Sequence, residues 1–172
     1  MVSPKKRWEK ASDIVRDAGG RVVGRTKLQK IAYLLELCGL GEGFKFEYRH
    51  YGPYSEDLTE AIQLADAFGL VKEDQRRADW GGMYSVYSLA TPSIQATGPR
   101  AEFAKAAAEI GAIELELAAT AAYLKTVEHY PDPWEETKRR KPEKATDARL
   151  KSAKEAYDQL QKISVRRALP RL

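Results

Sequence analysis

The spacing of apolar residues predicts three helices in the first part of the chain. They lie at residues 3–18, 26–38 and 55–68, where apolar side chains recur every three or four positions and glycine follows each segment. Ser3-Pro4 predicts the start of the first helix, because serine is a favoured N-cap and proline fits the first helical position. Ser55 predicts the N-cap of the third. The second segment is so apolar that most of that helix should be buried.

Alternating patterns predict short strands around the third helix. Between residues 44 and 50, aromatic residues and histidine alternate with charged residues, as in a half-buried strand that Gly52-Pro53 then ends. Two β-prone runs, at residues 70–72 and 83–89, flank a polar segment at residues 73–82, which predicts a hairpin with a long loop. The order helix, helix, strand, helix, strand, loop, strand is that of a winged-helix-like unit.

Helical periodicity returns in the second half. An alanine-rich helical region opens at Pro99 and extends to about Val127, and Gly111 allows a break within it. The prolines that follow, at positions 131, 133 and 142, predict a loop. A last helix is expected from about Thr146 to residue 163.

Together these elements predict a mainly α chain of the α+β class. Residues 1–92 are expected to form the winged-helix-like helices with a small β-hairpin, and residues 93–163 the helical bundle half of the same compact domain. The basic tail at residues 164–172 is expected to be loose, as chain ends usually are.

Composition narrows the class of protein. The chain has 172 residues, 43% of them apolar and 31% charged, which suits one globular domain. Its single cysteine, Cys38, excludes an internal disulfide and favours a reducing compartment. Residues 1–10 lack the apolar run of a signal peptide, and residues 80–99 are too rich in Gly, Ser, Thr and Pro to span a membrane. We therefore expect a cytoplasmic protein without a membrane partner.

The net charge of +4 conceals a segregated pattern. Residues 1–30 carry nine basic and three acidic side chains, residues 31–136 eight and eighteen, and residues 137–172 twelve and four. Basic ends could attract nucleic acid. They could also neutralise the acidic middle of the same fold or steer a charged protein partner, and we favour these two readings over nucleic acid.

Several patterns resemble catalytic or ligand sites without completing one. Gly19, Gly24, Arg25 and Thr26 have P-loop spacing, but arginine replaces the lysine and the preceding residues are periodic for helix. Thr26 with Gln29 instead has the spacing of a capping box. The glycines at 39, 41 and 43 also follow a helix, which indicates a turn instead of a dinucleotide loop.

The sequence offers few residues that could form a metal site or a catalytic nucleophile. The two histidines, His50 and His129, lie far apart, and Cys38 falls on a buried-looking stripe. A small acidic site is conceivable at His129, Asp132, Glu135 and Glu136, although a polar proline-containing segment is more often only a loop. We expect a protein that is not an enzyme and has no cofactor or metal.

Nucleic-acid binding is the alternative that a winged-helix order raises. The helix that would enter the major groove, Ser55 to Phe68, contains four acidic residues and no lysine or arginine, which opposes contact with a polyanion. DNA binding would therefore have to use other basic residues. The candidates are Lys5, Lys6, Arg7, Arg25, Lys27, Lys30 and the hairpin residues Arg76 and Arg77.

Aromatic residues gather in two places. Tyr48, Tyr51 and Tyr54 surround Gly52-Pro53, and the hairpin region holds Trp80, Tyr84 and Tyr87. Tyrosine and tryptophan are typical of protein interfaces, but they also fill cores, and the sequence leaves both readings open.

Two motifs resemble a known family. Lys27-Leu28-Gln29-Lys30 with Tyr33, followed by Tyr51-Gly52-Pro53-Tyr54-Ser55 with Leu58, resemble the Panacea domain of SocA-type antitoxins, most closely its YwgA-like branch of uncharacterised proteins. The segment from Leu117 to Leu124 and Lys141-Pro142 are also similar to that branch.

The resemblance implies a bacterial or phage protein that binds a toxin and blocks it without catalysis. The expected partner-binding residues are Tyr51, Gly52, Pro53, Tyr54, Arg76, Arg77 and Trp80. Two alternatives remain, a DNA-binding regulator and an accessory subunit of a phage-defence complex.

Overall fold

The computed structural model describes residues 3–91 and 95–172, and its α+β class is the predicted one. Within these ranges the helices are α1 Arg7–Asp17, α2 Arg25–Leu37, α3 Glu56–Ala67, α4 Pro99–Glu109, α5 Ala112–Thr126, α6 Pro133–Arg140 and α7 Asp147–Gln161. The strands are β1 Arg21–Val23, β2 Glu47–Arg49, β3 Gly52–Tyr54, β4 Val71–Arg77 and β5 Met83–Leu89. No helix in the described ranges combines the length and apolar composition that a bilayer span requires.

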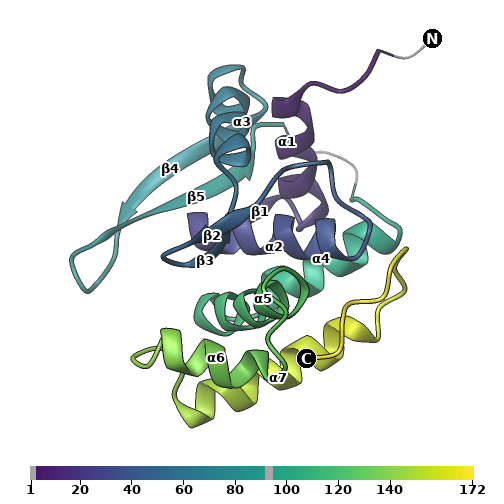
Figure 1. Ribbon diagram of the computed structural model, residues 1–172. Coiled ribbons are helices and arrows are strands. Elements are labelled where there is room, and N and C mark those ends of the chain that lie inside the picture. Colours follow the sequence, from purple (N-terminus) through teal and green to yellow (C-terminus); the bar gives the residue numbers. More distant parts are fainter. Residues whose placement is uncertain (1–2, 92–94) are drawn as a thin grey trace.

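The first three helices pack against a three-stranded antiparallel sheet of order β1-β5-β4 (Figure 1). Val22, Tyr87 and Val71 face these helices and are buried in the core. Strand β1, which pairs with β5, was not predicted, because a run of three residues between glycines shows no measurable periodicity. The observed order has two strands beyond the predicted helix-strand order, β1 between α1 and α2 and β3 before α3.

The β-rich segments differ from prediction in extent. Strand β4 continues to Arg77, so the loop expected from residue 73 begins only at Ala78. The strand expected from residue 44 is reduced to β2, although the predicted alternation of burial is present. Gly52-Pro53 does not end the β structure. It forms the start of β3, which pairs with β2 across a tight turn. Pro53 lies opposite Tyr48, a position at which its missing N–H can be tolerated.

Helix starts were predicted with mixed success. Ser55 and Thr146 are the N-caps of α3 and α7, as expected, and accept hydrogen bonds from Leu58 N–H and Arg149 N–H. Ser3-Pro4 does not begin α1, because the cap lies at Lys6, whose N–H donates to the Glu9 carboxylate (2.7 Å).

The predicted capping box of α2 is also wrong. That helix begins one residue before Thr26, after Gly24 with φ of 100°, and the side chain of Gln29 is used elsewhere.

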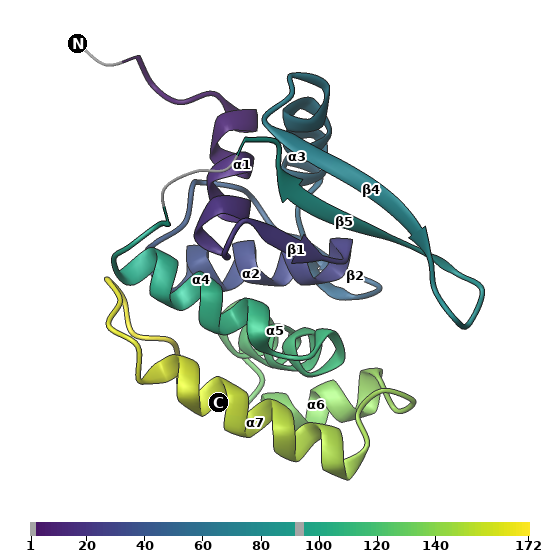
Figure 2. The ribbon, with the colours of Figure 1, turned by 180° about the vertical axis from the view of Figure 1, so that it is seen from behind.

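Helix α5 occupies the middle of the molecule. Its residues from Leu115 to Leu124 are all buried, with α2 and β3 on one side and α6 and α7 on the other (Figures 1 and 2). The break allowed at Gly111 is present between α4 and α5. Helix α6 was not expected, because the prolines were interpreted as a loop, whereas Pro133 occupies its first turn after the cap Asp132.

The C-terminal tail is docked, contrary to expectation. Leu169 is buried, the Tyr157 hydroxyl donates to the Pro170 carbonyl oxygen (2.6 Å), and Arg167 N–H donates to the Cys38 carbonyl oxygen (2.9 Å). These contacts hold the tail against α7 and the end of α2, where sequence pattern alone gave no signal.

Candidate functional site

Two side chains of α2 hold the main chain of the β2–β3 hairpin. The Gln29 amide bonds to Ser55 in both directions: its Nε2 donates to the carbonyl oxygen (2.9 Å), and its Oε1 accepts from the N–H (2.8 Å). Lys30 donates from Nζ to the Pro53 carbonyl oxygen (2.7 Å). All four residues are buried, so the bonds are shielded from water. The motifs at residues 27–30 and 51–55 therefore form one structural unit.

Gly52 permits close contact between the hairpin and α5. Its φ is 86°, and a Cβ at this position would lie 2.4 Å from Thr120 Oγ1. A side chain is thus excluded by both conformation and space. Gly52 and Pro53 are buried, so the structure does not support their predicted role as direct partner contacts.

A buried cluster of charges lies behind the hairpin. Lys144 donates from Nζ to both oxygens of the Glu116 carboxylate (3.0 Å each), and Lys141 Nζ lies 3.6 Å from the same carboxylate. Lys141 also donates to the His50 carbonyl oxygen (2.9 Å). Burial lowers the pKa of Lys30 to about 7; Glu116 opposes the shift, whereas the charges of Lys141 and Lys144 add to it. The ammonium groups of Lys30, Lys141 and Lys144 thus all interact with the carboxylate of Glu116.

The turn of this hairpin presents aromatic surface. Tyr51 is 56% exposed, and Lys144 Nζ lies 4.5 Å from its ring centre. The guanidinium of Arg49 covers the ring of Tyr54 (5.0 Å), whose hydroxyl is 2.6 Å from the Thr59 hydroxyl. These contacts restrict both rings, which reduces the entropy lost when a partner binds.

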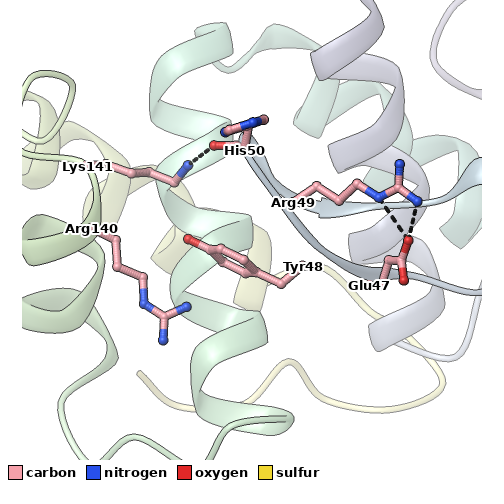
Figure 3. Close-up of a pocket in the computed structure, with 6 residues that line it drawn as sticks. All are labelled: Glu47, Tyr48, Arg49, His50, Arg140 and Lys141. Carbon is pink, nitrogen blue, oxygen red and sulfur yellow. Dashed lines mark hydrogen bonds and ion pairs between the residues drawn. The ribbon is translucent and has the colours of Figure 1, made fainter.

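An open pocket of about 660 Å³ lies beside β2 (Figure 3). Its lining residues are Glu47, Tyr48, Arg49, His50, Arg140 and Lys141. Arg140 lies over the Tyr48 ring (4.9 Å) and pairs with Glu128 (2.9 Å), while Arg49 pairs with Glu47. The cations around this pocket are therefore already paired, and the pocket offers shape more than charge to a ligand.

The second aromatic position is the tip of the β4–β5 hairpin, which projects from the body of the molecule (Figures 1 and 2). Trp80 is 79% exposed, and Met83 is also largely exposed. A Cβ on Gly82 would lie 1.6 Å from the Trp80 ring, so the indole rests on the Gly82 main chain. Tyr87 is buried in the core and cannot contact a partner.

The structure brings the predicted partner-binding residues to one side of the molecule. Figures 1 and 2 show both hairpins pointing in the same direction, with Tyr51 on β2–β3 and Trp80 on β4–β5. The hairpins are held separately, the first by α2 and α5 and the second by α3 and β1. Arg76 and Arg77 are exposed on β4, next to the tip.

Most of the basic residues considered for nucleic acid are engaged within the fold. Lys30 is only 1% exposed and cannot reach a ligand, and Lys27 donates to the Ala108 carbonyl oxygen (2.9 Å). Lys6 is exposed at the start of α1. Three more form ion pairs: Lys5 with Asp13, Arg7 with Asp57 (3.7 Å) and Glu60 (3.6 Å), and Arg25 with Glu73 (3.5 Å).

The weaker chemical alternatives gain nothing from the geometry. Strand β1 lies inside the glycine segment instead of before it, so that segment lacks P-loop architecture. Asp132 caps α6, and the Arg139 and Arg140 side chains lower the pKa of Glu136 to about 2. In the part of the chain that is described, no three His, Cys, Asp or Glu residues are placed to hold a metal ion. Burial raises the pKa of the Cys38 thiol, which disfavours the reactive thiolate.

Sequence reasoning missed the partners of Gln29 and Lys30. A signal was present, because Gln29 and Lys30 lie between Leu28 and Ile31 in a helix expected to be mostly buried, and buried polar groups must find partners. Apart from the Thr59 hydroxyl, to which Gln29 Nε2 also donates (3.1 Å), their hydrogen-bond partners are main-chain atoms, which side-chain patterns do not reveal.

Comparison with known proteins gives a partial relationship. No family model matches the chain, and no solved structure matches it. Over 71 residues it is 35% identical to "Uncharacterized protein YwgA" of Bacillus subtilis (strain 168), covering 41% of this chain and 42% of that protein. The chain is thus similar to YwgA over a segment that spans less than half of either protein.

Proposed function

We propose that the chain is a non-enzymatic protein-binding module that neutralises or adapts a protein partner by direct contact. The observation that carries this proposal is Trp80, an indole 79% exposed on a projecting hairpin and supported by Gly82. Large exposed aromatic residues in fixed positions are typical centres of protein interfaces. Tyr51 supplies a second such residue on the same side.

Resemblance to SocA-type antitoxins suggests which kind of binding module this is. The two motifs that carry the resemblance are in contact through Gln29 and Lys30, so they belong to one part of the fold. The partial similarity to YwgA is compatible with the same branch, whose members are uncharacterised. In this proposal the partner is a toxin, and binding blocks it by occlusion of its working surface.

A DNA-binding regulator is less well supported. Helix α3 exposes Glu56, Glu60 and Asp66, which would repel phosphates from the helix that a winged-helix protein uses for recognition. Several basic residues near the N-terminus are already paired with carboxylates. An accessory role in a defence complex would use the same protein-binding surface.

The test is a tagged capture from the native host, treated with nuclease and washed at moderate and then high salt. We expect one near-stoichiometric protein that survives high salt and is lost from the Trp80→Ala and Tyr51→Ala variants. Phe68→Ala is the matched control, because Phe68 is about as exposed as Tyr51 but lies at the end of α3. Recovery of nucleic acid alone, removed by salt, would overturn the proposal in favour of DNA binding.

A further inference from the structure

Strand β4 has one free edge. The sheet order β1-β5-β4 leaves β4 at its border, and hydrogen bonds from Ala78 N–H to the Gly82 oxygen and from Ala90 N–H to the Leu70 oxygen set the pattern of the pairing. The main-chain N–H and C=O groups of the even-numbered β4 residues therefore point toward β5. Those of the odd-numbered residues point away from the sheet.

The first part of this edge is closed by the protein itself. The outward N–H of Glu73 donates to the Asp66 carboxylate of α3 (3.1 Å), so α3 caps the edge there. Beyond it, the outward groups of Gln75 and Arg77 continue toward the projecting tip (Figure 2). The open edge is thus the segment Gln75–Arg77, which ends three residues before Trp80.

Charge divides the strand at the same place. Lys72 pairs with Asp74 (3.7 Å) and Glu73 with Arg25 (3.5 Å), which balances the capped part. Arg76 and Arg77 are exposed, and neither forms an ion pair within the described ranges. The open part of the edge is therefore basic.

We propose that the edge Gln75–Arg77 binds an extended acidic segment of a protein partner as an additional strand, with Trp80 and Met83 contacting an apolar side chain of that segment. Main-chain hydrogen bonds would supply affinity, and the arginines and the indole would select the sequence. This inference rests on the proposed protein-binding function and specifies its partner.

The same charges argue against a second copy of this chain as the occupant. Two open edges pairing antiparallel about Arg76 would place arginine beside arginine, and like charges in adjacent strands are unfavourable. Natural edge strands use charge in this way to prevent self-association. An acidic segment reverses the sign of the interaction.

The test screens the purified full chain against displayed random linear peptides and measures the dissociation constants of the enriched sequences. We expect enrichment of acidic segments with an apolar residue, weakened roughly tenfold or more by Arg77→Glu and by Trp80→Ala. Gln75→Pro, which removes one outward N–H, should weaken binding as well. Phe68→Ala should bind like the wild type.

Any of five results would overturn the inference. In the peptide screen they are the absence of enriched peptides, enriched peptides without acidic character, and binding that Arg77→Glu does not weaken. The other two are a dimer of the chain that Trp80→Ala abolishes and duplex DNA bound through Arg76 and Arg77. Circular dichroism on each variant separates loss of binding from loss of fold. If the host capture yields a stable protein partner whose binding ignores Arg77→Glu and Gln75→Pro, the proposed function stands and only the β4 edge is wrong.

Discussion

Lys30 Nζ donates a 2.7 Å hydrogen bond to the carbonyl oxygen of Pro53 and so joins α2 to the β2–β3 hairpin. The lysine is almost completely buried, and Glu116 is the carboxylate that offsets its charge. A buried ammonium has a substantial desolvation cost unless hydrogen bonds and nearby charges offset it. The position of the hairpin, and of Tyr51 at its turn, therefore depends on a charged residue in the core.

The first prediction concerns Lys30 and pH. Its pKa is about 7 in the folded protein and about 10.4 in an unfolded chain, so the unfolded chain binds more protons between these values. The free energy of unfolding of the wild type should then rise with pH relative to Lys30→Met, by up to about 1.4 kcal/mol per pH unit from about pH 7 to pH 10.

Urea unfolding at several pH values measures this difference, and Lys162→Met on the exposed end of α7 controls for the loss of a lysine. A difference between wild type and Lys30→Met that stays constant from pH 7 to pH 10 would contradict the assignment of a depressed pKa to this group.

The second prediction concerns the amide of Gln29. Gln29→Leu leaves the N–H of buried Ser55 without its partner, whereas the Ser55 carbonyl oxygen keeps the Thr59 N–H (3.2 Å) and the Thr59 hydroxyl (3.3 Å) as donors. We expect a loss of about 1–3 kcal/mol in the free energy of unfolding, because an unsatisfied buried N–H costs roughly that much.

Chemical denaturation of Gln29→Leu is compared with Gln63→Leu on the exposed face of α3, which should lie within about 0.5 kcal/mol of the wild type. Equal effects from the two variants would show that the Gln29–Ser55 pair does not hold the hairpin.

The third prediction separates strain from collision at Gly52. Gly52→Ala should destabilise through both its φ of 86° and the contact with Thr120 Oγ1, whereas Gly81→Ala, with φ of 93° and open space, should show strain alone. The expected cost is about 1 kcal/mol for strain and several for the two effects together.

Thr120→Ala in the Gly52→Ala background should recover part of the loss, because Thr120 Oγ1 has no hydrogen-bond partner among the described residues. A double-mutant cycle measured by thermal unfolding gives the coupling. If the effects of Gly52→Ala and Thr120→Ala are strictly additive, a collision with Thr120 does not contribute to the loss of stability.

The helices and the β2–β3 hairpin differ in how far the sequence could predict them. The apolar stripes of α2, α3 and α7 repeat over several turns, so their burial was correctly expected. The β2–β3 hairpin was not, because it is held by main-chain contacts with Gln29, Lys30 and Lys141 that side-chain periodicity does not encode. At the candidate site, the sequence left open whether Trp80 and Tyr51 lie at the surface or in the core; both are exposed, whereas Gly52 and Lys30 are buried and serve the fold.

The docked tail gives the last prediction. Cys38 is fully buried, burial raises its thiol pKa, and its carbonyl oxygen accepts from Arg167 N–H. Leu169→Asp would place a charge where the tail packs, which should release the tail and expose the end of α2. We expect the maleimide reaction of Cys38 to be slow in the wild type and roughly tenfold or more faster in Leu169→Asp.

Arg171→Ala, at an exposed tail position, is the control. The free energy of unfolding is measured for each variant, so that the contribution of global unfolding to the reaction rate can be subtracted. Equal rates in Leu169→Asp and Arg171→Ala, after that correction, would mean that α7 and the core protect Cys38 without help from the tail.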